Sequence, residues 1–261
     1  MHAKPKKSLG QNFLIDKNIQ RKIIHACSFK ESDVVLEIGS GEGALTRLIS
    51  ESAGMVYALE IDPDLCAALK EDFKKYKNIR IINEDILKFD LEGGIKELND
   101  KIKVIGNIPY YITTPIIEHL IKYRRIIKTI FLTVQKEFAR RVVANSGSAD
   151  YGSFSCFIQY YTKPEILFSI KRTCFRPVPK VDSSFLRLDM RDTPFVIVKD
   201  EDLFFKIIRA GFNKRRKTLR NSLKGIIAPT KLDAFFRKYS IGCDVRPEEL
   251  SLRDFANLAN I

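Results

Sequence analysis

Short apolar runs alternate with segments of helical periodicity along the first 190 or so residues of the chain. The runs indicate strands that are largely buried on both faces, as in a parallel sheet. The predicted strands are Val34–Ile38, Val56–Glu60, Ile79–Ile82, Ile102–Ile105 and Ile130–Val134, and the predicted helices include Gly43–Ala53, Pro63–Tyr76 and Thr114–Tyr123. This alternation predicts a doubly wound, Rossmann-like α/β domain. Two later runs, Glu165–Ile170 and Ser184–Met190, are expected to add an antiparallel edge pair.

The pattern changes after Met190. Asp192-Thr-Pro194 has the composition of a linker, and the apolar positions that follow it recur at helical spacing. Those positions are Phe204, Ile207, Ile208, Phe212, Leu219, Leu223, Leu232, Phe235, Phe236, Leu250, Phe255 and Leu258. We therefore expect two domains, an α/β domain over residues 1–190 and a small all-helical domain over residues 191–261.

The chain has 261 residues, 45% of them hydrophobic, which is enough for one sizeable core and a smaller second module. Its five cysteines are scattered without a C-x-x-C pair, and its three histidines lack metal-ligand spacing. Neither a disulfide framework nor a metal site is therefore expected. No apolar stretch reaches the ~18 residues of a membrane helix. We expect a cytoplasmic monomer with reduced thiols and no membrane partner.

The formal net charge of +13 favours a polyanionic partner. Residues 191–261 hold 15 Lys and Arg against 9 Asp and Glu, so the shorter domain is the more basic per residue. Positions 206–224 contain many basic residues and no acid, which predicts contact with nucleic acid. The residues expected to hold phosphates are Lys4, Lys6, Lys7, Arg140, Arg141, Lys214, Arg215, Arg216, Lys217 and Arg220.

A glycine-rich loop joins the first predicted strand to the helix that follows it. Gly39-Ser-Gly41-Glu-Gly43-Ala44 fits G-x-G-x-x-G/A, and Glu60 ends the second strand 21 positions beyond Gly39. Glycines allow close backbone approach, a helix N-terminus favours an anionic group, and a carboxylate accepts hydrogen bonds from ribose hydroxyls. By themselves these features fit NAD as well as S-adenosylmethionine.

Three observations favour S-adenosylmethionine. Glu37 places a carboxylate where it would repel a pyrophosphate but hold an ammonium group. Asp85, after the third strand, can accept a hydrogen bond from an adenine amine, although a helix or turn cap explains it equally well. The third observation is a site for the amino group of a base at the end of the fourth strand, which has a use for a methyl donor and none for a nicotinamide.

That site is Asn107-Ile108-Pro109-Tyr110. It offers an amide acceptor, a rigid turn that exposes a backbone carbonyl, and a ring on which a base can stack. Alone, the tetrapeptide also fits a strand that ends in a turn. Beside a donor loop it predicts methylation of an amino group, in which the Asn107 oxygen and the carbonyl of Ile108 or Pro109 accept the N–H groups and favour a pyramidal nitrogen.

Two aromatic residues are predicted to stack on the target base, Tyr110 and Phe175. The alternative for Phe175 is a core position beside a proline-rich loop. Tyr111 is expected to pack in the core or behind the site. A stacked base must first leave its own stack, which costs least in an RNA loop.

Five ordered motifs resemble those of the ribosomal RNA adenine dimethyltransferases, and within that family those of the small-subunit enzymes. They are Gly10–Asp16, Leu36–Thr46, Gly106–Pro115, Phe175–Ser183 and Phe212–Leu223. The resemblance implies a class I methyltransferase fold. It also implies that S-adenosylmethionine is used to dimethylate N6 of two adjacent adenosines in a hairpin loop near the 3′ end of small-subunit rRNA, with the assembling 30S-type subunit as partner.

The resemblance further implies the roles of single residues. In this family the Gln-Asn-Phe-Leu segment folds over the donor, which assigns donor contacts to Gln11, Asn12 and Leu14. The resemblance also assigns donor contacts to the glycine loop, to the acid that binds the ribose, to the acid that contacts the adenine and to the asparagine of the tetrapeptide. Residues next to the two acids are included. Together with the acid before the glycines, these donor-binding residues are Glu37, Gly39, Gly41, Glu60, Ile61, Asp85, Ile86 and Asn107.

Two alternatives of different kinds remain. One is the related methyltransferase of large-subunit rRNA that confers macrolide resistance. Gly10 and the run Lys217–Leu223 favour the small-subunit enzyme over it. The other is a mainly non-catalytic ribosome-assembly or RNA-binding factor, or a protein of the mitochondrial transcription factor B type. Intact acids at the donor site, together with Asn107, favour retained catalysis.

Overall fold

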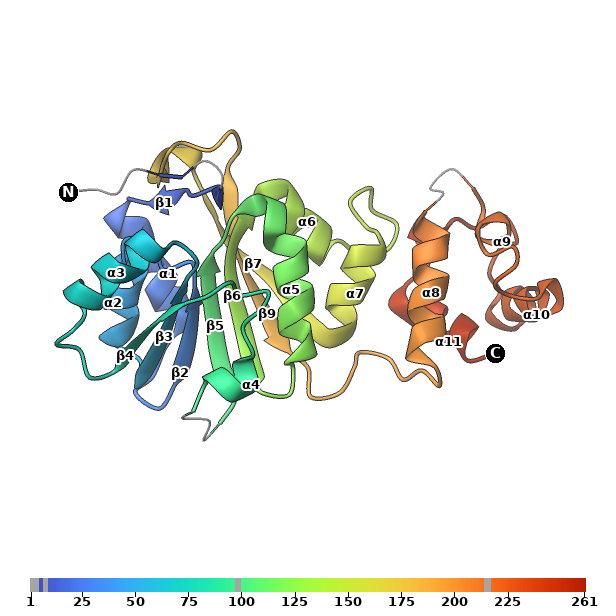
Figure 1. The fold of residues 1–261 in the computed structure, drawn as a ribbon. Helices are drawn as coiled ribbons and strands as arrows, with labels where there is room; N and C mark the ends of the chain where they lie inside the picture. Colours follow the sequence, from blue (N-terminus) through green and yellow to red (C-terminus); the bar gives the residue numbers. More distant parts are fainter. Residues whose placement is uncertain (1–4, 7–8, 97–99, 214–216) are drawn as a thin grey trace. The chain divides into compact units, whose positions relative to one another are not determined.

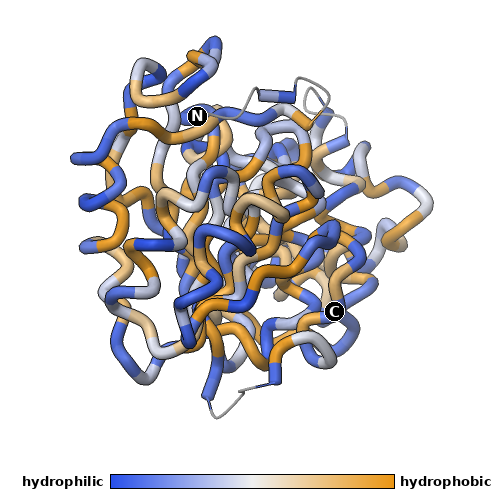
Figure 2. Tube along the Cα trace, turned by 60° about the vertical axis from the view of Figure 1, so that its left-hand side comes forward, coloured by the Kyte–Doolittle hydropathy of each residue, from blue (hydrophilic) through white to orange (hydrophobic). Residues whose placement is uncertain are grey.

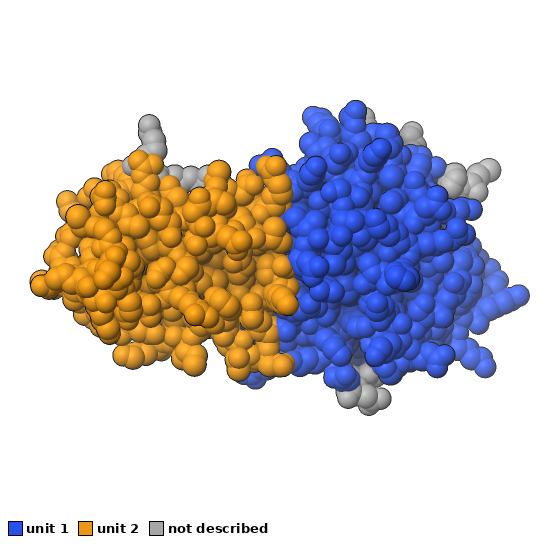
Figure 3. Space-filling model, turned by 180° about the vertical axis from the view of Figure 1, so that it is seen from behind, with its two compact units in different colours: residues 1–139, 165–190 blue, residues 140–164, 191–261 orange. Residues whose placement is uncertain are grey.

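The computed structural model describes residues 5–6, 9–96, 100–213 and 217–261. The chain forms two compact units, the first of residues 1–139 and 165–190 and the second of residues 140–164 and 191–261 (Figure 3). The expected domains differ from these units in residues 140–164, which group with the C-terminal residues. The reason is helix α7 (Ser153–Tyr161), whose aromatic rings pack against residues that follow position 191. The ring centroids of Phe157 and Phe205, for example, lie 5.6 Å apart.

A seven-stranded sheet organises the first unit, with strand order β4-β3-β2-β5-β6-β9-β7 (Figure 1). The strands β2 to β6 are parallel neighbours, and β9 runs antiparallel to β6. Their bounds are β2 Val34–Ile38, β3 Met55–Glu60, β4 Ile79–Asn83, β5 Ile102–Asn107, β6 Ile127–Gln135, β7 Thr162–Ile170 and β9 Ser183–Met190. The prediction of a doubly wound α/β fold is confirmed.

Both faces of this sheet are covered by helices. Val35 and Val56 belong to a core that also contains the inward faces of α1, α2 and α3. The alternate positions Leu36, Val104 and Ile130 are fully buried as well, and alternation along a strand directs them to the opposite face. Figure 2 shows the resulting alternation of apolar and hydrophilic stretches along the trace. The helices of this unit are α1 Lys17–Cys27, α2 Ala44–Ser50, α3 Pro63–Asp72, α4 Leu91–Gly94 and α5 Thr113–Lys122, and α6 Lys136–Val143 follows them at the boundary between the two units.

The strand order reverses between β2 and β5, because β3 and β4 extend the sheet on one side of β2 and β6 extends it on the other side of β5. In open α/β sheets the loops that follow the strands diverge at such a point and leave a crevice for a ligand. A second, two-stranded sheet is formed by β1 (Phe13–Leu14) and β8 (Phe175–Arg176), which pair antiparallel. It joins the N-terminal segment to a stretch near the end of the first unit.

The second unit is helical, as expected for the C-terminal residues. Its core includes an aromatic cluster in which Tyr160 and Phe204 lie 5.2 Å apart between centroids. Tyr161 also donates a hydrogen bond to Glu201, at the start of α8. The helices after α7 are α8 Glu201–Phe212, α9 Leu219–Ser222, α10 Pro229–Tyr239 and α11 Leu252–Ala259.

Candidate active site

Three small cavities lie along the carboxyl ends of β2, β3, β4 and β5, and Gly39 lines all three. The first, of about 70 Å³, is lined by Leu9, Gly10, Gln11, Asn12, Phe13, Gly39, Gly41, Glu60, Ile61, Asn107, Ile108, Pro109 and Tyr110. The second, of about 40 Å³, is lined by Phe13, Leu14, Glu37, Gly39, Ser40, Gly41, Glu42, Ala44, Leu45 and Asn107. The third, of about 70 Å³, is lined by Leu9, Ile38, Gly39, Leu59, Ile61, Glu84, Asp85, Ile86, Ile108, Pro109, Tyr111, Ile112 and Ile116. The residues predicted from separate motifs thus meet at one edge of the sheet.

The glycine loop requires its glycines for two different reasons. Gly39 has φ +74°, and a Cβ there would meet only the Asn107 carbonyl at 3.6 Å, so a side chain would project into the space of the cavities. Gly41 has φ +57°, and a Cβ there would lie 3.1 Å from the ring of Phe13. The first glycine keeps the backbone open to a ligand, and the second lets the N-terminal segment pack down on the loop.

Glu37 is a buried carboxylate at the end of β2. Its side chain accepts a hydrogen bond from the Thr46 hydroxyl at 2.5 Å and lines the 40 Å³ cavity. Desolvation raises the pKa of Glu37 to about 7, against the opposing effect of the hydrogen bond from Thr46. A buried acid of this kind is stabilised in its charged form by a cation, so the site suits an ammonium group.

Glu60, at the end of β3, is held by the backbone. Its Oε2 accepts from the Gly41 amide at 2.8 Å, and its Oε1 accepts from the Asp62 amide at 2.9 Å. Burial raises the pKa of Glu60, while these backbone hydrogen bonds act to lower it. Each carboxylate oxygen has a further acceptor position, which is what two ribose hydroxyls need. The adjacent Ile61 is 47% exposed and offers an apolar surface beside it.

Asp85 and Ile86 follow β4 and line the third cavity. The Asp85 Oδ1 accepts a hydrogen bond from the Leu87 amide at 3.0 Å, so the residue serves as a turn cap. The cap uses one carboxylate oxygen, and the residue still lines the cavity. Ile86 is 5% exposed and supplies an apolar wall of the kind an adenine ring packs against.

Asn107 ends β5, and its Nδ2 donates to the backbone carbonyl of Asn12 at 2.8 Å. The Pro109 carbonyl accepts from the Ile112 amide at 3.2 Å, which leaves the Ile108 carbonyl as the better candidate for an incoming amine. The Tyr110 hydroxyl lies 2.6 Å from that of Ser183, which fixes the ring of a half-buried tyrosine at the edge of the first cavity.

Residues 9–14 form a wall of the first two cavities, and together with residues 5–6 they are called the N-terminal segment below. Gln11, Asn12 and Leu14, which were predicted to contact the donor, all line one of the first two cavities. Gln11 Nε2 also donates to Asp62 at 3.1 Å. The β1–β8 pairing aligns Leu14 with Phe175 and so anchors this segment at its far end.

Two aromatic predictions are corrected by the structure. Phe175 is 1% exposed and packs in the core with Leu14 and Phe185, so its ring is not available to a base. Its backbone is occupied by pairing with β1, which directs the side chain inward. Tyr111, expected to be packed away, is instead 66% exposed, because its ring lies over Gly10 at the surface and not in the sheet core.

Several predicted phosphate-binding residues already have acidic partners. Lys6 contacts Asp62 and Asp64, Arg140 contacts Asp150 at 3.3 Å, and Arg220 contacts Asp233. The exposed residues Arg141 and Lys217 belong to the second unit. The remaining predicted positions, Lys4, Lys7, Lys214, Arg215 and Arg216, lie outside the described residues.

Sequence reasoning missed several lining residues, among them Leu9, Phe13, Ser40 and Leu59. Phe13 lies inside the segment expected to cover the donor, so its position could have indicated a contact. Leu59 gave no signal beyond that of a buried strand residue. Within the described ranges no group of His, Cys, Asp and Glu side chains is arranged to hold a metal ion. No helix in that part of the chain has the length and apolar composition needed to cross a membrane.

The arrangement fits S-adenosylmethionine in its charge and in the order of its polar groups. A buried carboxylate faces one cavity, backbone-held Glu60 faces the next, and Asp85 with Ile86 faces the third. These match an ammonium group, a ribose and an adenine in that order along the sheet edge. Gly39, with open space where a Cβ would be, allows a ligand to pass close to the backbone between them.

Residues 2–261 match the family described as ribosomal RNA adenine dimethylase. A relative named Ribosomal RNA small subunit methyltransferase A from Clostridium botulinum is 42% identical, over 97% of this chain and 92% of the relative. The protein of the same name from Caldanaerobacter subterraneus subsp. tengcongensis is 45% identical, over 98% of this chain and 97% of the relative.

Among solved structures, a dimethyladenosine transferase from Plasmodium falciparum has a TM-score of 0.80 at 28% identity, covering 94% of this chain and 95% of that one. The 23S rRNA methyltransferase ErmE has a TM-score of 0.73 at 26% identity, covering 95% and 100%. This chain therefore belongs to the ribosomal RNA adenine dimethylase family.

Proposed function

We propose that this chain transfers methyl groups from S-adenosylmethionine to N6 of two adjacent adenosines in the 3′-terminal hairpin loop of small-subunit rRNA, giving N6,N6-dimethyladenosine during assembly of the subunit. The observation that carries the proposal is the position of Asn107. Its side chain lines the same two cavities as Gly39 and Gly41, and its amide nitrogen is tied to Asn12. An acceptor for an amine therefore lies directly beside the donor loop.

The chain contributes acceptors and position. Because Asn107 Nδ2 donates to the Asn12 carbonyl, the Asn107 Oδ1 is turned the other way and can accept from an adenine N–H. The Ile108 carbonyl accepts the second N–H, and both hydrogen bonds strengthen as the nitrogen becomes pyramidal. The donor, when bound, supplies a methyl group activated by a sulfonium. No general base is required, since the methylated nitrogen is acidic enough to release its proton to water.

We propose Tyr110 alone as the residue that stacks on the target base, because the ring of Phe175 is buried. Its hydroxyl contact to Ser183 holds the ring in place at the edge of the first cavity. A ring that is already oriented loses little entropy when a base stacks on it. The adenosine has to leave its own stack to reach this ring, which an RNA loop permits.

The choice of small-subunit over large-subunit RNA rests on the relatives. Proteins named for the small subunit are 42% and 45% identical to this chain over nearly all its length, against 26% for the 23S rRNA methyltransferase ErmE. We also propose that Arg141 and Lys217, with the basic residues at 214–216, hold RNA phosphates. Cytoplasmic location and a monomeric state complete the proposal.

Incubation of the protein with labelled S-adenosylmethionine and small subunits that lack this modification tests the proposal. The label should map to two neighbouring adenosines of the hairpin loop and should be released as N6,N6-dimethyladenosine. Large subunits and naked small-subunit rRNA serve as parallel substrates. Label confined to large-subunit RNA, or no label in any RNA, would show that the proposal is wrong.

A further inference from the structure

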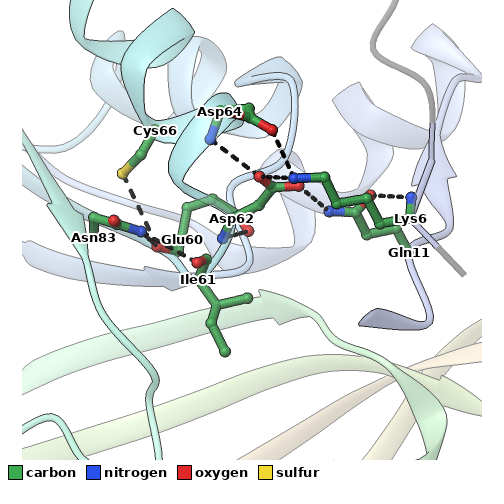
Figure 4. Close-up of polar contacts among 8 residues, drawn as sticks. All are labelled: Lys6, Gln11, Glu60, Ile61, Asp62, Asp64, Cys66 and Asn83. Carbon is green, nitrogen blue, oxygen red and sulfur yellow. Dashed lines mark hydrogen bonds and ion pairs between the residues drawn. The ribbon is translucent and has the colours of Figure 1, made fainter. Parts of the chain in front are cut away.

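Lys6 lies in a polar cluster that ties the N-terminal segment to the loop after β3 (Figure 4). Its ammonium contacts Asp62 Oδ1 and Asp64 Oδ2, both at 2.7 Å. Gln11 Nε2 donates to the other oxygen of Asp62 at 3.1 Å, and the backbone amide of Lys6 donates to Gln11 Oε1 at 2.8 Å. Asp62 thus receives two side chains from one segment.

Asp62 is a firm anchor, because its own surroundings fix it. The carboxylate caps α3 by accepting from the Asp64 amide at 3.0 Å, and the Asp62 amide donates to Glu60 Oε1 at 2.9 Å. The residue that holds the N-terminal segment is therefore hydrogen-bonded directly to the acid proposed to bind the ribose. The side chain of Asp62 holds the N-terminal segment, and the backbone amide of the same residue holds the Glu60 carboxylate.

The covering segment has further attachments beyond this cluster. Asn12 accepts from Asn107 Nδ2, and Phe13 and Leu14 pair with β8. Between the attachments, residues 9–13 form a wall of the first cavity, whose volume is about 70 Å³. A donor that occupies these cavities would therefore lie against this segment, and the attachments of the segment would bear on how firmly the donor is held.

We infer that Lys6, Gln11 and Asp62 are positioning residues that hold the N-terminal segment against the donor, and so govern how tightly the donor is bound and how fast it is released. The inference rests on the proposed function for the identity of the donor. It assigns Lys6 to the protein's own carboxylates and not to RNA phosphate.

The two carboxylates that Lys6 contacts are unequal in their surroundings. The side chain of Asp62 is 3% exposed, whereas that of Asp64 is 82% exposed. Burial acts to raise the pKa of Asp62, yet hydrogen bonds from Lys6 and Gln11 bring it below its ordinary value. An exposed pair contributes little, while a buried, hydrogen-bonded carboxylate contributes more. The contact with Asp62 is the one that holds the segment.

Binding of S-adenosylmethionine and S-adenosylhomocysteine to the full chain without RNA tests the inference. Lys6→Met and Asp62→Asn should each weaken donor binding about tenfold, mainly through faster dissociation. Asn at position 62 still caps α3, and thermal unfolding will show that the variant folds. At saturating donor, turnover on small subunits should stay within about twofold of the wild type, so that KM for the donor changes and kcat does not.

Three further variants separate this role from a general effect on the fold. Asp64→Asn and Lys74→Met, which removes an exposed pair with Glu71, should change donor affinity less than about twofold. Lys6→Arg should keep the donor affinity of the wild type, because it preserves the charge. The double variant Lys6→Met with Asp62→Asn should bind the donor no more weakly than Asp62→Asn alone. The inference is overturned if Lys6→Met and Asp62→Asn each bind the donor as tightly as the wild type, or if Asp64→Asn loses as much affinity as they do. Because donor binding is measured without RNA, failure of methyl transfer to small subunits by the wild type is a separate result.

Discussion

The Asn107 side-chain amide donates a hydrogen bond to the backbone carbonyl of Asn12 at 2.8 Å, across 95 positions of sequence. A carbonyl only accepts, so the amide nitrogen must face the N-terminal segment and the amide oxygen must face away from it. One side chain therefore both holds the N-terminal segment and turns its amide oxygen toward the position that we propose for the target amine. In that proposal, the donor site and the base site are joined at this residue.

Replacement of Asn107 by Ala should lower methyl transfer about 100-fold or more, because an acceptor that strengthens in the transition state is lost. Donor affinity should fall only a few-fold, since the bond to Asn12 is one of several attachments of the segment. Single-turnover transfer to small subunits and donor titration measure the two effects separately.

Asn78→Ala is the matched control, because the Asn78 Nδ2 also donates to backbone carbonyls, those of Ser50 and Ala53, away from the cavities. It should lose stability and keep the transfer rate. Near wild-type transfer by Asn107→Ala would contradict the mechanism.

Glu37 should make the stability of the donor-free protein depend on pH. Its pKa is raised from 4.5 to about 7 by burial, so between these values the folded protein keeps a proton that the unfolded chain releases. Stability then falls as pH rises through that window, by about 3 kcal/mol at ~1.4 kcal/mol per pKa unit. Glu37→Gln should lack this contribution, which urea unfolding of both proteins from pH 4 to 8 will show as a difference in slope.

The same group should make donor binding depend on pH in the opposite sense. An ammonium group favours the ionised carboxylate, so the affinity for S-adenosylmethionine should rise between pH 6 and 8 with release of a proton. Calorimetry in buffers of different ionisation enthalpy measures that proton. Proton release of the same size in Glu37→Gln would rule out Glu37 as its source.

Phe175 should behave as a core residue. Phe175→Ala should cost about 3–5 kcal/mol of stability, and Phe175→Leu, which fills more of the space, should cost less. Transfer by the folded Leu variant should stay within about twofold of the wild type. A large loss of transfer without loss of stability would restore the stacking role that the sequence predicted.

Gly41→Ala should affect both stability and donor binding. The new Cβ would sit at φ +57° and 3.1 Å from the Phe13 ring, so a strain of about 1 kcal/mol is joined by displacement of the covering segment. Gly147→Ala is the control, since φ is +84° there and no atom of the described residues lies within 4 Å of the new Cβ. Both variants should lose stability, and only Gly41→Ala should bind the donor more weakly. Equal donor affinity in the two would show that Phe13 does not need to rest on the loop.

The sheet and the loop residues could be predicted because their signals are local. Buried strands leave continuous apolar runs, and a glycine loop followed by an acid at the next strand end indicates a nucleotide-type site wherever it occurs. Gly39 and Glu60 were predicted in this way, Glu37 from its place just before the glycines, and Asn107 from the tetrapeptide that ends the fourth strand. The structure places all four around adjoining cavities.

The remaining features depend on contacts between distant segments. Phe175 was predicted to stack on the target base, with a core position as the alternative, because an aromatic before a proline-rich loop can serve either role. Its pairing with Leu14 decides the matter, and no local pattern encodes that pairing. Lys6 was predicted to bind phosphate from its charge alone, since its acidic partner Asp62 lies 56 positions away.

The short β1–β8 sheet has a consequence for the protein during its own synthesis. Phe13 and Leu14 pair with Arg176 and Phe175, which lie more than 160 positions later in the chain. A nascent chain that has not yet released Arg176 from the ribosome has every glycine and acid of the donor site but lacks this one attachment of its N-terminal segment. The β1–β8 sheet is therefore completed late in translation, after the rest of the donor site.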